Sequence, residues 1–330
     1  MTGTTFLMRA WYTKNIMMEK KGDAGMIVER QLGTDDQELV WVESLVEADN
    51  DRQKLQQSYG LTEEILTYVT DENERSHYDR DEYLNTQLFV LHVPVVIDEV
   101  AQRSITRPIT LLLKGNRVFT FTTKRTQWVN ELLEDKLKRE TITDTNQFVL
   151  ISFFILFDQF IGPIRRINAE QNRLDRQLNQ SPDNKDLIAL SNLQQSLAYF
   201  VSATRNNTMM VINLDNTPFG KQLSDKNREL LMDAVIEARQ TSEMTATEAD
   251  VVDRISSTFN NVLNNNLNDT MKFLTIWSLV LTIPTIVTGF YGMNVKLPIA
   301  NSPISWIFTI AITVGFMVGI AQYLRHRHFW

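Results

Sequence analysis

Two long uncharged stretches near the end of the chain are the strongest feature of its hydrophobic pattern. No charged residue occurs from Phe273 to Val295 or from Leu297 to Leu324, so Lys296 alone interrupts them. About 20 mostly apolar residues are enough to cross the roughly 30 Å hydrocarbon core of a bilayer. The pattern therefore predicts a transmembrane hairpin, with a first span at residues 271–290 and a second at 304–324.

The first 125 residues carry a different pattern, in which β-branched residues and alternating apolar positions recur. Such runs are typical of strands, and the Gly-containing link Lys114-Gly115-Asn116 indicates a hairpin between the last two. One stretch of helical spacing, Arg52 to Tyr68, lies between the first two. We therefore expect an α/β domain over residues 1–125. Its predicted strands are Leu39–Leu45, Leu88–Ile97, Ile109–Leu113 and Val118–Thr122.

Helical spacing takes over in residues 126–220, where glycine and proline become rare. The apolar run Phe148–Phe160 rivals the two spans, but its uncharged core ends at Asp158 after about ten residues, which favours a buried helix. A turn with an N-cap at Ser181-Pro182-Asp183-Asn184 predicts a helical hairpin, and residues 213–220 predict the next break. The expected helices are Trp128–Leu137, Phe148–Phe160, Arg165–Asn179 and Lys185–Arg205.

Between Gly220 and Gly289 the chain contains no glycine, and its one proline is Pro284. A single helix from Ser224 to Phe290 would be roughly 100 Å long. It would form a stalk over residues 221–270 and continue as the first span. Because a helix of that length needs partners along it, we expect an oligomer. The alternative is two helices broken near Gln240–Thr247, where serine and threonine lower helix propensity, but the absence of a breaker favours one helix.

One face of this predicted helix stays polar through the membrane. Hydroxyls, amides and glycine recur along it every three or four residues, with no carboxylate inside the span. Close helix packing and a water-filled pore both satisfy such a row, so the row alone does not decide between them. In a pore, neutral oxygens would suit Mg²⁺ that keeps its water shell, and apolar side chains would close the pathway by dewetting. The face comprises Ser257, Asn261, Asn264, Asn268, Met271, Leu274 (or Thr275), Ser278, Thr282, Thr285 and Gly289.

Composition narrows the chemistry. The net charge of -7 and the lack of a basic stripe argue against nucleic acid as a partner. The chain has no cysteine and only 4 histidines, and it shows no Gly-rich phosphate loop, so we do not expect an enzyme. The first ten residues are too polar for a signal peptide, which predicts that the large domain stays in the cytosol.

The basic residues around the spans predict the orientation. Lys272 precedes the uncharged part of the first span, and the tail at residues 325–330 begins Arg325-His326-Arg327-His328. Positive residues favour the cytosolic side, so both termini are expected there. Trp306 and Trp330 suit opposite interfaces.

The outer loop at residues 291–303 opens on Tyr291-Gly292-Met293-Asn294, between the two spans. In this position the tetrad resembles the signature of the CorA family of divalent cation channels, which includes mitochondrial and zinc-transporting relatives. The motif match covers about the last 70 residues, and the layout agrees over the whole chain. The resemblance implies a homopentameric funnel of the plasma membrane: an α/β N-terminal cytosolic domain, a long-helix stalk and two C-terminal transmembrane helices. It also implies Mg²⁺ as the usual ion, with Co²⁺ or Ni²⁺ tolerated.

The resemblance also implies roles for single residues. Asn294 becomes a ring of amide oxygens at the outer mouth, presented by a turn that Gly292 and Met293 hold. The family's acidic residue for sensing Mg²⁺ between subunits falls at Asp233, close to Glu237. The pore face falls on the polar stripe found above, at Asn268, Met271, Leu274, Ser278, Thr282, Thr285 and Gly289.

Two positions depart from the family's pattern. The partner acid of the sensing site falls at Tyr68, so Asp71 is expected to replace it, although all these acids also suit an ordinary solvated surface. The outer loop has no acidic residue, and Lys296 near the mouth would weaken the attraction of cations.

We therefore expect passive Mg²⁺ uptake driven by the membrane potential and closed by cytosolic Mg²⁺. One alternative is a transporter of Zn²⁺ or another divalent ion. Another, from a different class, is a membrane-tethered scaffold or sensor without ion flux.

Overall fold

The structure is a computed structural model that describes residues 27–32, 39–45, 49–138, 140, 142–178, 183–293 and 304–326. The chain divides into two compact units, Met1–Ile255 and Ser256–Trp330. The first holds the α/β domain and the helices that pack on it, and the second holds the two candidate spans.

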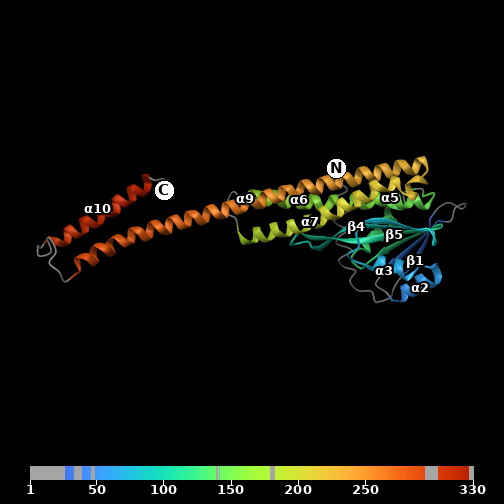
Figure 1. Cartoon of the computed structure of the whole chain (residues 1–330), viewed down its shortest axis with the longest axis horizontal. Coiled ribbons are helices and arrows are strands. Elements are labelled where there is room, and N and C mark those ends of the chain that lie inside the picture. The colour runs from blue at the N-terminus through green and yellow to red at the C-terminus, as the bar shows by residue number, and fades with distance from the viewer. Residues whose placement is uncertain are drawn as a thin grey trace. The chain divides into compact units, whose positions relative to one another are not determined.

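A six-stranded mixed sheet lies at the centre of the first unit (Figure 1). Its strand order is β1-β2-β6-β5-β4-β3, in which β2 and β6 pair in parallel and all other neighbours are antiparallel. The strands are β1 (Val28–Leu32), β2 (Leu39–Leu45), β3 (His77–Asp81), β4 (Thr86–Asp98), β5 (Arg103–Lys114) and β6 (Arg117–Thr122).

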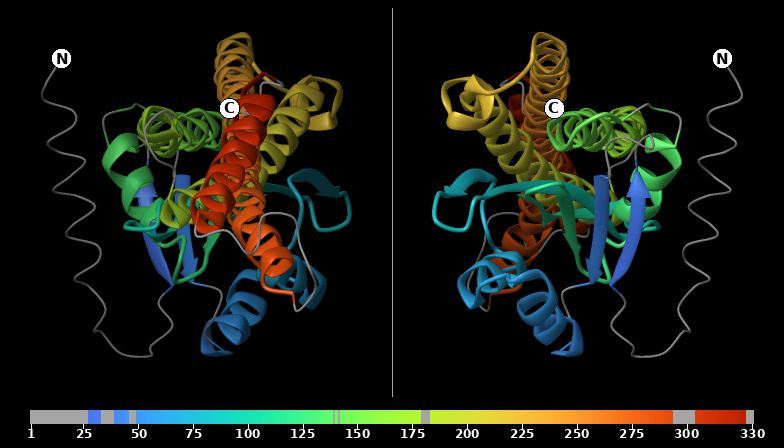
Figure 2. Two further views of the ribbon diagram at one scale, coloured as in Figure 1. Left: turned by 90° about the vertical axis from the view of Figure 1, so that its left-hand side faces the viewer. Right: turned by 90° about the vertical axis from the view of Figure 1, so that its right-hand side faces the viewer.

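Helices cover both faces of this sheet (Figure 1 and Figure 2). On β4, Phe89 and Leu91 point to one face, whereas Leu88 and Val90 point to the other, and all four are buried. The second of these faces packs against α2 (Asp49–Tyr59) and α3 (Glu63–Thr70). The first packs against α4 (Trp128–Leu137), α5 (Thr145–Asp158), the end of α7 (Asn184–Asn213) and the start of α9 (Asp225–Tyr291). Because both faces are covered, the inner strands carry buried apolar residues on both of their sides.

The interpretation of Phe148–Phe160 as core is confirmed. Three helical segments of the described chain are long and apolar enough to cross a membrane. In the first, Thr145–Gln177, 61% of the apolar window is buried inside the protein, against 6% in Asp225–Tyr291 and 0% in Trp306–His326. Only the last two are free to meet lipid.

The predicted helical hairpin is present as α6 (Ile161–Leu178) and α7. Asp183 caps α7 in a capping box with Asp186. The rings of Phe160 and Phe200 lie 5.6 Å apart, and Arg173 lies 3.7 Å from Asp186, so the two helices run antiparallel. A short 3-10 turn (Leu214–Asn216) and α8 (Pro218–Lys221) then form the expected break before α9.

The stretch from Arg52 to Tyr68 is helical as predicted, but it forms two helices, α2 and α3, because the chain breaks at Gly60. This glycine adopts φ +63, a left-handed conformation that ends α2. The Lys114 ammonium donates to the carbonyls of Tyr59 and Gly60 at 2.9 and 2.7 Å and so caps that end. The edge strands β1 and β3 were also not predicted.

The long helix is confirmed as α9, which runs unbroken for 67 residues. The alternative break near Gln240–Thr247 is wrong. Thr241, Thr245 and Thr247 donate their hydroxyls to the carbonyls four residues back, at 2.7, 2.6 and 2.9 Å. Each hydroxyl is thereby satisfied within the helix.

Candidate ion pathway and acidic sites

The predicted pore face is an exposed face of α9 in the second unit. Asn268, Ser278, Thr282, Thr285 and Gly289 are all exposed in the single chain. On the far side of the helix, Ile283 and Val287 are buried, at 7% and 8% exposure. The helix therefore has a narrow covered strip around Ile283 and Val287, and the rest of its surface, including the polar face, is exposed in the single chain.

The threonines on and near this face donate their hydroxyl protons to backbone carbonyls of the same helix. The hydroxyl of Thr282 donates to the carbonyl of Ser278 at 2.7 Å, and that of Thr285 donates to Leu281 at 3.2 Å. Thr275 makes the same bond to Met271 at 2.8 Å. A hydroxyl has one proton but two lone pairs, so each oxygen still offers an acceptor to the open side. Acceptors are what a cation or the water around it requires.

Two apolar side chains interrupt the polar face at its N-terminal end. Met271 and Leu274 are 57% and 58% exposed in the single chain. They lie next to each other on the face, between Asn268 and Ser278. A ring of such side chains from several copies would form a narrow apolar constriction.

Gly292 ends α9 in a conformation that leaves little room for a side chain. Its N–H donates to the carbonyl of Thr288 at 2.8 Å. A Cβ at this position would lie 3.1 Å from that same carbonyl oxygen. Met293 follows and is 53% exposed. Asn294, Lys296 and the rest of the outer loop lie outside the described residues.

The ends of the spans carry basic residues, as predicted. Lys272 lies 3.2 Å from Asp269, one turn before it, at the start of the first span. The second span, α10 (Ser305–His326), has Arg325 and His326 in its last turn. Trp306 is exposed near its start, whereas Arg327, His328 and Trp330 lie outside the described residues.

Two of the predicted sensing acids are exposed. Asp233 lies on the open side of α9 in the first unit. Asp71 follows α3, and its carboxylate accepts the backbone N–H of Asn73 at 2.8 Å. Tyr68, which stands where the family has an acid, is 41% exposed and lies 6.3 Å, ring to ring, from His77.

Glu237 differs, because it is half-buried against a second carboxylate. Burial raises the pKa of Glu237, and the nearby charge of Asp158 raises it further. One carboxylate oxygen of Glu237 is buried without a hydrogen-bond partner among the described residues. Sequence reasoning did not select Asp158 as a site residue, although it is the charge that ends the apolar run of α5.

The acids do not form a complete metal site within one chain. No group of three or more metal-binding side chains occurs in the described parts of the sequence. Asp71, Asp233 and Glu237 are therefore not brought together by this fold alone. A site built from them needs ligands from elsewhere.

Comparison with known proteins assigns this layout to a family. The model of the family described as CorA-like Mg²⁺ transporter protein matches residues 36–326. The cobalt/magnesium transport protein CorA of Methanocaldococcus jannaschii is 23% identical over 314 residues, covering 93% of this chain and 96% of that protein.

Solved structures show the same fold. The complete structure of the CorA magnesium transporter from Methanocaldococcus jannaschii has a TM-score of 0.76 at 20% identity, covering 94% of this chain and 100% of that one. The full-length CmaX protein has a TM-score of 0.68 at 18% identity, covering 93% and 100%. The cytoplasmic domain of ZntB from Vibrio parahaemolyticus has a TM-score of 0.60 at 10% identity, covering 73% and 100%. The expected fold, an α/β domain followed by a long helix and a C-terminal apolar helix, is confirmed.

Proposed function

Because this chain belongs to the CorA-like Mg²⁺ transporter family and is a divalent cation transporter rather than an enzyme, we propose that it is a homopentameric channel for Mg²⁺. Mg²⁺ enters passively, driven by the membrane potential, and Co²⁺ and Ni²⁺ also pass. One observation carries the proposal. The open face of α9 presents oxygens that accept hydrogen bonds, and no carboxylate lies within the span.

This face suits an ion that keeps its water. Mg²⁺ sheds its water shell reluctantly, so a pathway need only accept hydrogen bonds from that shell. Thr282 and Thr285 offer such acceptors because their own protons are bonded inside the helix. Gly292 and Met293 lead into Asn294, whose amide oxygens form the outer binding ring in this proposal.

The direct test replaces Asn294 with Ala in the full-length protein reconstituted in liposomes. Flux of Mg²⁺ should fall sharply, while the oligomeric mass should not change. Flux equal to that of the parent would reject the proposed role of the ring. Asn301→Ala, in the same outer loop but outside the tetrad, is the matched control.

Ion preference needs its own measurement. Neutral oxygens select weakly among small divalent ions, so we expect uptake of Mg²⁺ with competition from Co²⁺ and Ni²⁺. A competition panel at fixed pH, with and without a proton gradient, measures this. Transport of Zn²⁺ alone would favour the zinc alternative, and no flux of any divalent ion would favour a tethered scaffold or sensor.

Regulation in this proposal uses the acids of the first unit. Asp233 and Glu237 of one copy bind cytosolic Mg²⁺ together with Asp71 of the next, and occupied sites hold the channel closed. One observation supports ligands from a second copy: the three acids are not grouped within the described part of one chain. Asp233→Ala should therefore weaken closure by Mg²⁺. A dose response that matches the parent would make Asp233 an ordinary surface residue.

The membrane arrangement follows from the two exposed apolar helices. In this proposal the first span is α9 from residue 271, the second is α10, both lie in the plasma membrane, and both termini face the cytosol. The basic residues Lys272 and Arg325 at the predicted cytosolic ends support this orientation. Labelling of single cysteines introduced into the outer loop and the C-terminal tail of the cysteine-free chain tests it.

A further inference from the structure

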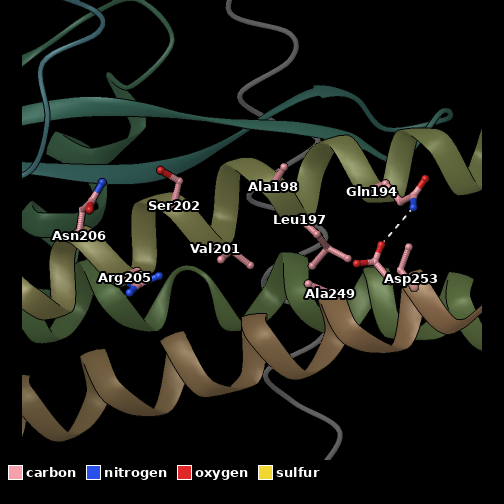
Figure 3. Close-up of a pocket in the computed structure, with 10 residues that line it drawn as sticks. Gln194, Leu197, Ala198, Val201, Ser202, Arg205, Asn206, Ala249 and Asp253 are labelled. Carbon is pink, nitrogen blue, oxygen red and sulfur yellow. Dashed lines mark hydrogen bonds between the residues drawn. The ribbon is translucent and has the colours of Figure 1, made fainter.

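A groove of about 560 Å³ lies between α7 and α9 in the first unit (Figure 3). Its middle is apolar, formed by Leu197, Val201 and Val252. At one end the Gln194 amide donates to the Asp253 carboxylate at 3.1 Å, as the dashed line in Figure 3 marks. At the other end lies Arg205. The groove therefore combines an apolar floor with one cationic end.

Arg205 is an unused cation. It is exposed, and no ion pair or side-chain hydrogen bond involves it within the part of the chain that the structure describes. The acid nearest to it in the groove, Asp253, already accepts the Gln194 amide at the opposite end. Among the described residues, no other acid lines the groove, so an anion from a second chain can complete this end.

Two hydrogen bonds between α7 and α9 show which residues of α9 lie level with Arg205 of α7. Thr208 on α7 donates to the carbonyl of Ala238 on α9 at 2.8 Å, and Gln194 pairs with Asp253. The two helices are antiparallel, so moving back from Thr208 on α7 means moving forward from Ala238 on α9. Both bonds place Arg205 level with residues 241 and 242 of α9.

One acid of α9 lies level with Arg205, but on the side of α9 that faces away from α7. Glu243 is exposed and has no ion pair or side-chain hydrogen bond among the described residues. Thr241 and Thr245 are buried, and Glu243 lies on the opposite side of the helix from them. It cannot reach Arg205 of its own chain. It is placed to meet Arg205 of another.

A second pair of exposed side chains, one on α7 and one on α9, also lies at similar heights, one to two turns from Arg205 and Glu243. Met209 continues the line of the groove on α7 and is 56% exposed. By the same alignment it lies level with residue 237 of α9. Ile236 is 56% exposed and lies on the same side of α9 as Glu243. An apolar pair and a charge pair therefore occur at matching heights, on opposite sides of one chain.

We propose that the groove between α7 and α9 receives α9 of a second copy of this chain, with Glu243 of that copy paired to Arg205 and Ile236 packed against Met209. Rotation about an axis along the helices keeps every residue at its height, so each copy offers a groove on one side and its complement on the other. Such a head-to-tail contact closes into a ring when the rotation between neighbours divides a full turn. The inference rests on the homo-oligomer in the proposed function and adds the residues that form its cytosolic contact.

Cross-linking tests the contact directly, because the natural chain has no cysteine. Full-length Arg205→Cys/Glu243→Cys protein, treated with a short bis-maleimide, should give a ladder of covalent species up to the full ring. Either single variant should give none. The control Arg205→Cys/Asp250→Cys places the second thiol on the same side of α9 but about 10 Å higher, and should cross-link far less.

A second variant pair leaves the charges in place. Met209→Cys/Ile236→Cys should give the same ladder, with no ladder from either single variant. Both pairs failing to cross-link in a protein that is still oligomeric and carries Mg²⁺ would overturn this contact and leave the channel proposal standing. A monomeric protein would overturn both, and a ladder without flux would count against the channel alone.

Charge reversal provides an independent test. Arg205→Glu should weaken association about fivefold per contact, and adding Glu243→Arg should restore it; native mass spectrometry measures both. A small anion in the groove predicts instead that inorganic phosphate raises the Tm of the parent but not of Arg205→Gln, with no effect of Glu243→Arg on association. That outcome would reject the contact between copies.

Discussion

Replacement of Thr282 by Val tests whether the open face of α9 carries ions. Valine has nearly the same shape as threonine, so packing is preserved and only the hydroxyl is lost. The hydroxyl proton is bonded to the Ser278 carbonyl at 2.7 Å, so the function removed is the oxygen acceptor that faces the pathway. A hydrogen bond of this kind is worth about 1 kcal/mol. If the Thr282 oxygen accepts such a bond from the ion's water shell at the highest-energy point of permeation, loss of the bond slows flux about fivefold.

Thr288→Val is the matched control. Thr288 makes the same internal bond, to the Pro284 carbonyl at 2.7 Å, but it lies off the polar face. We expect Mg²⁺ flux into dye-loaded liposomes to fall for Thr282→Val and to stay at the parent level for Thr288→Val. Equal flux in all three proteins, or equal loss in both variants, would refute the assignment of the face to the pathway.

Three further predictions concern the first unit. Burial and the charge of Asp158 raise the pKa of Glu237, so its contribution to stability is present below its ordinary pKa of 4.5 and is lost as pH rises through the raised value. Glu237→Gln should therefore raise the Tm at pH 7 in chelator but not at pH 4. The Asn207 amide accepts from the backbone N–H of His92 at 3.0 Å and donates to its C=O at 2.9 Å. Asn207→Leu removes both bonds and should lower the free energy of unfolding, measured in urea, by about 2 to 4 kcal/mol. Gly60→Ala forces a Cβ into φ +63 and should cost about 1 kcal/mol by the same assay.

The controls for these predictions use the same readouts. Glu229→Gln, at an exposed acid of the same helix, should give the same Tm as the parent at both pH 4 and pH 7 in detergent. Asn206→Leu should cost much less than Asn207→Leu, because Asn206 is only half-buried and makes no such bond to the backbone of another strand among the described residues. Gly115 also has a positive φ, at +62, but no atom lies near a Cβ added there. If backbone strain is the cause, Gly115→Ala should lower the free energy of unfolding by about as much as Gly60→Ala.

The inner strands and the long helix could be predicted because burial and periodicity mark them. The predicted bounds of β2 are those observed, and β4, β5 and β6 each contain a predicted strand. The edge strands escaped notice because one side of each faces solvent: His77–Asp81 is charged, and Val28–Leu32 alternates without an apolar run. Gly60 was overlooked because its neighbours keep helical spacing, and only its left-handed φ shows the break.

The candidate site divides in the same way. The polar face of α9 could be found from spacing alone, since its residues are local in sequence. The approach of Asp158 to Glu237 could not, because it depends on how α5 packs against α9. For the same reason no sequence pattern indicated that Arg205 and Glu243 share one height.

The parallel pairing of β2 with β6 has a consequence for the order of folding. The strands β3 to β6 follow one another as antiparallel neighbours, so their contacts are local and form early. β2 must return across more than seventy residues to pair with β6, as Val40 does with Arg117, and the entropy of closing that loop delays it. Until it docks, β6 is an open strand edge that invites pairing with other chains. All of these strands leave the ribosome before the two long apolar helices, so the sheet has time to close before those helices are made. Variants that loosen β2 should therefore aggregate during synthesis more than their equilibrium stability suggests.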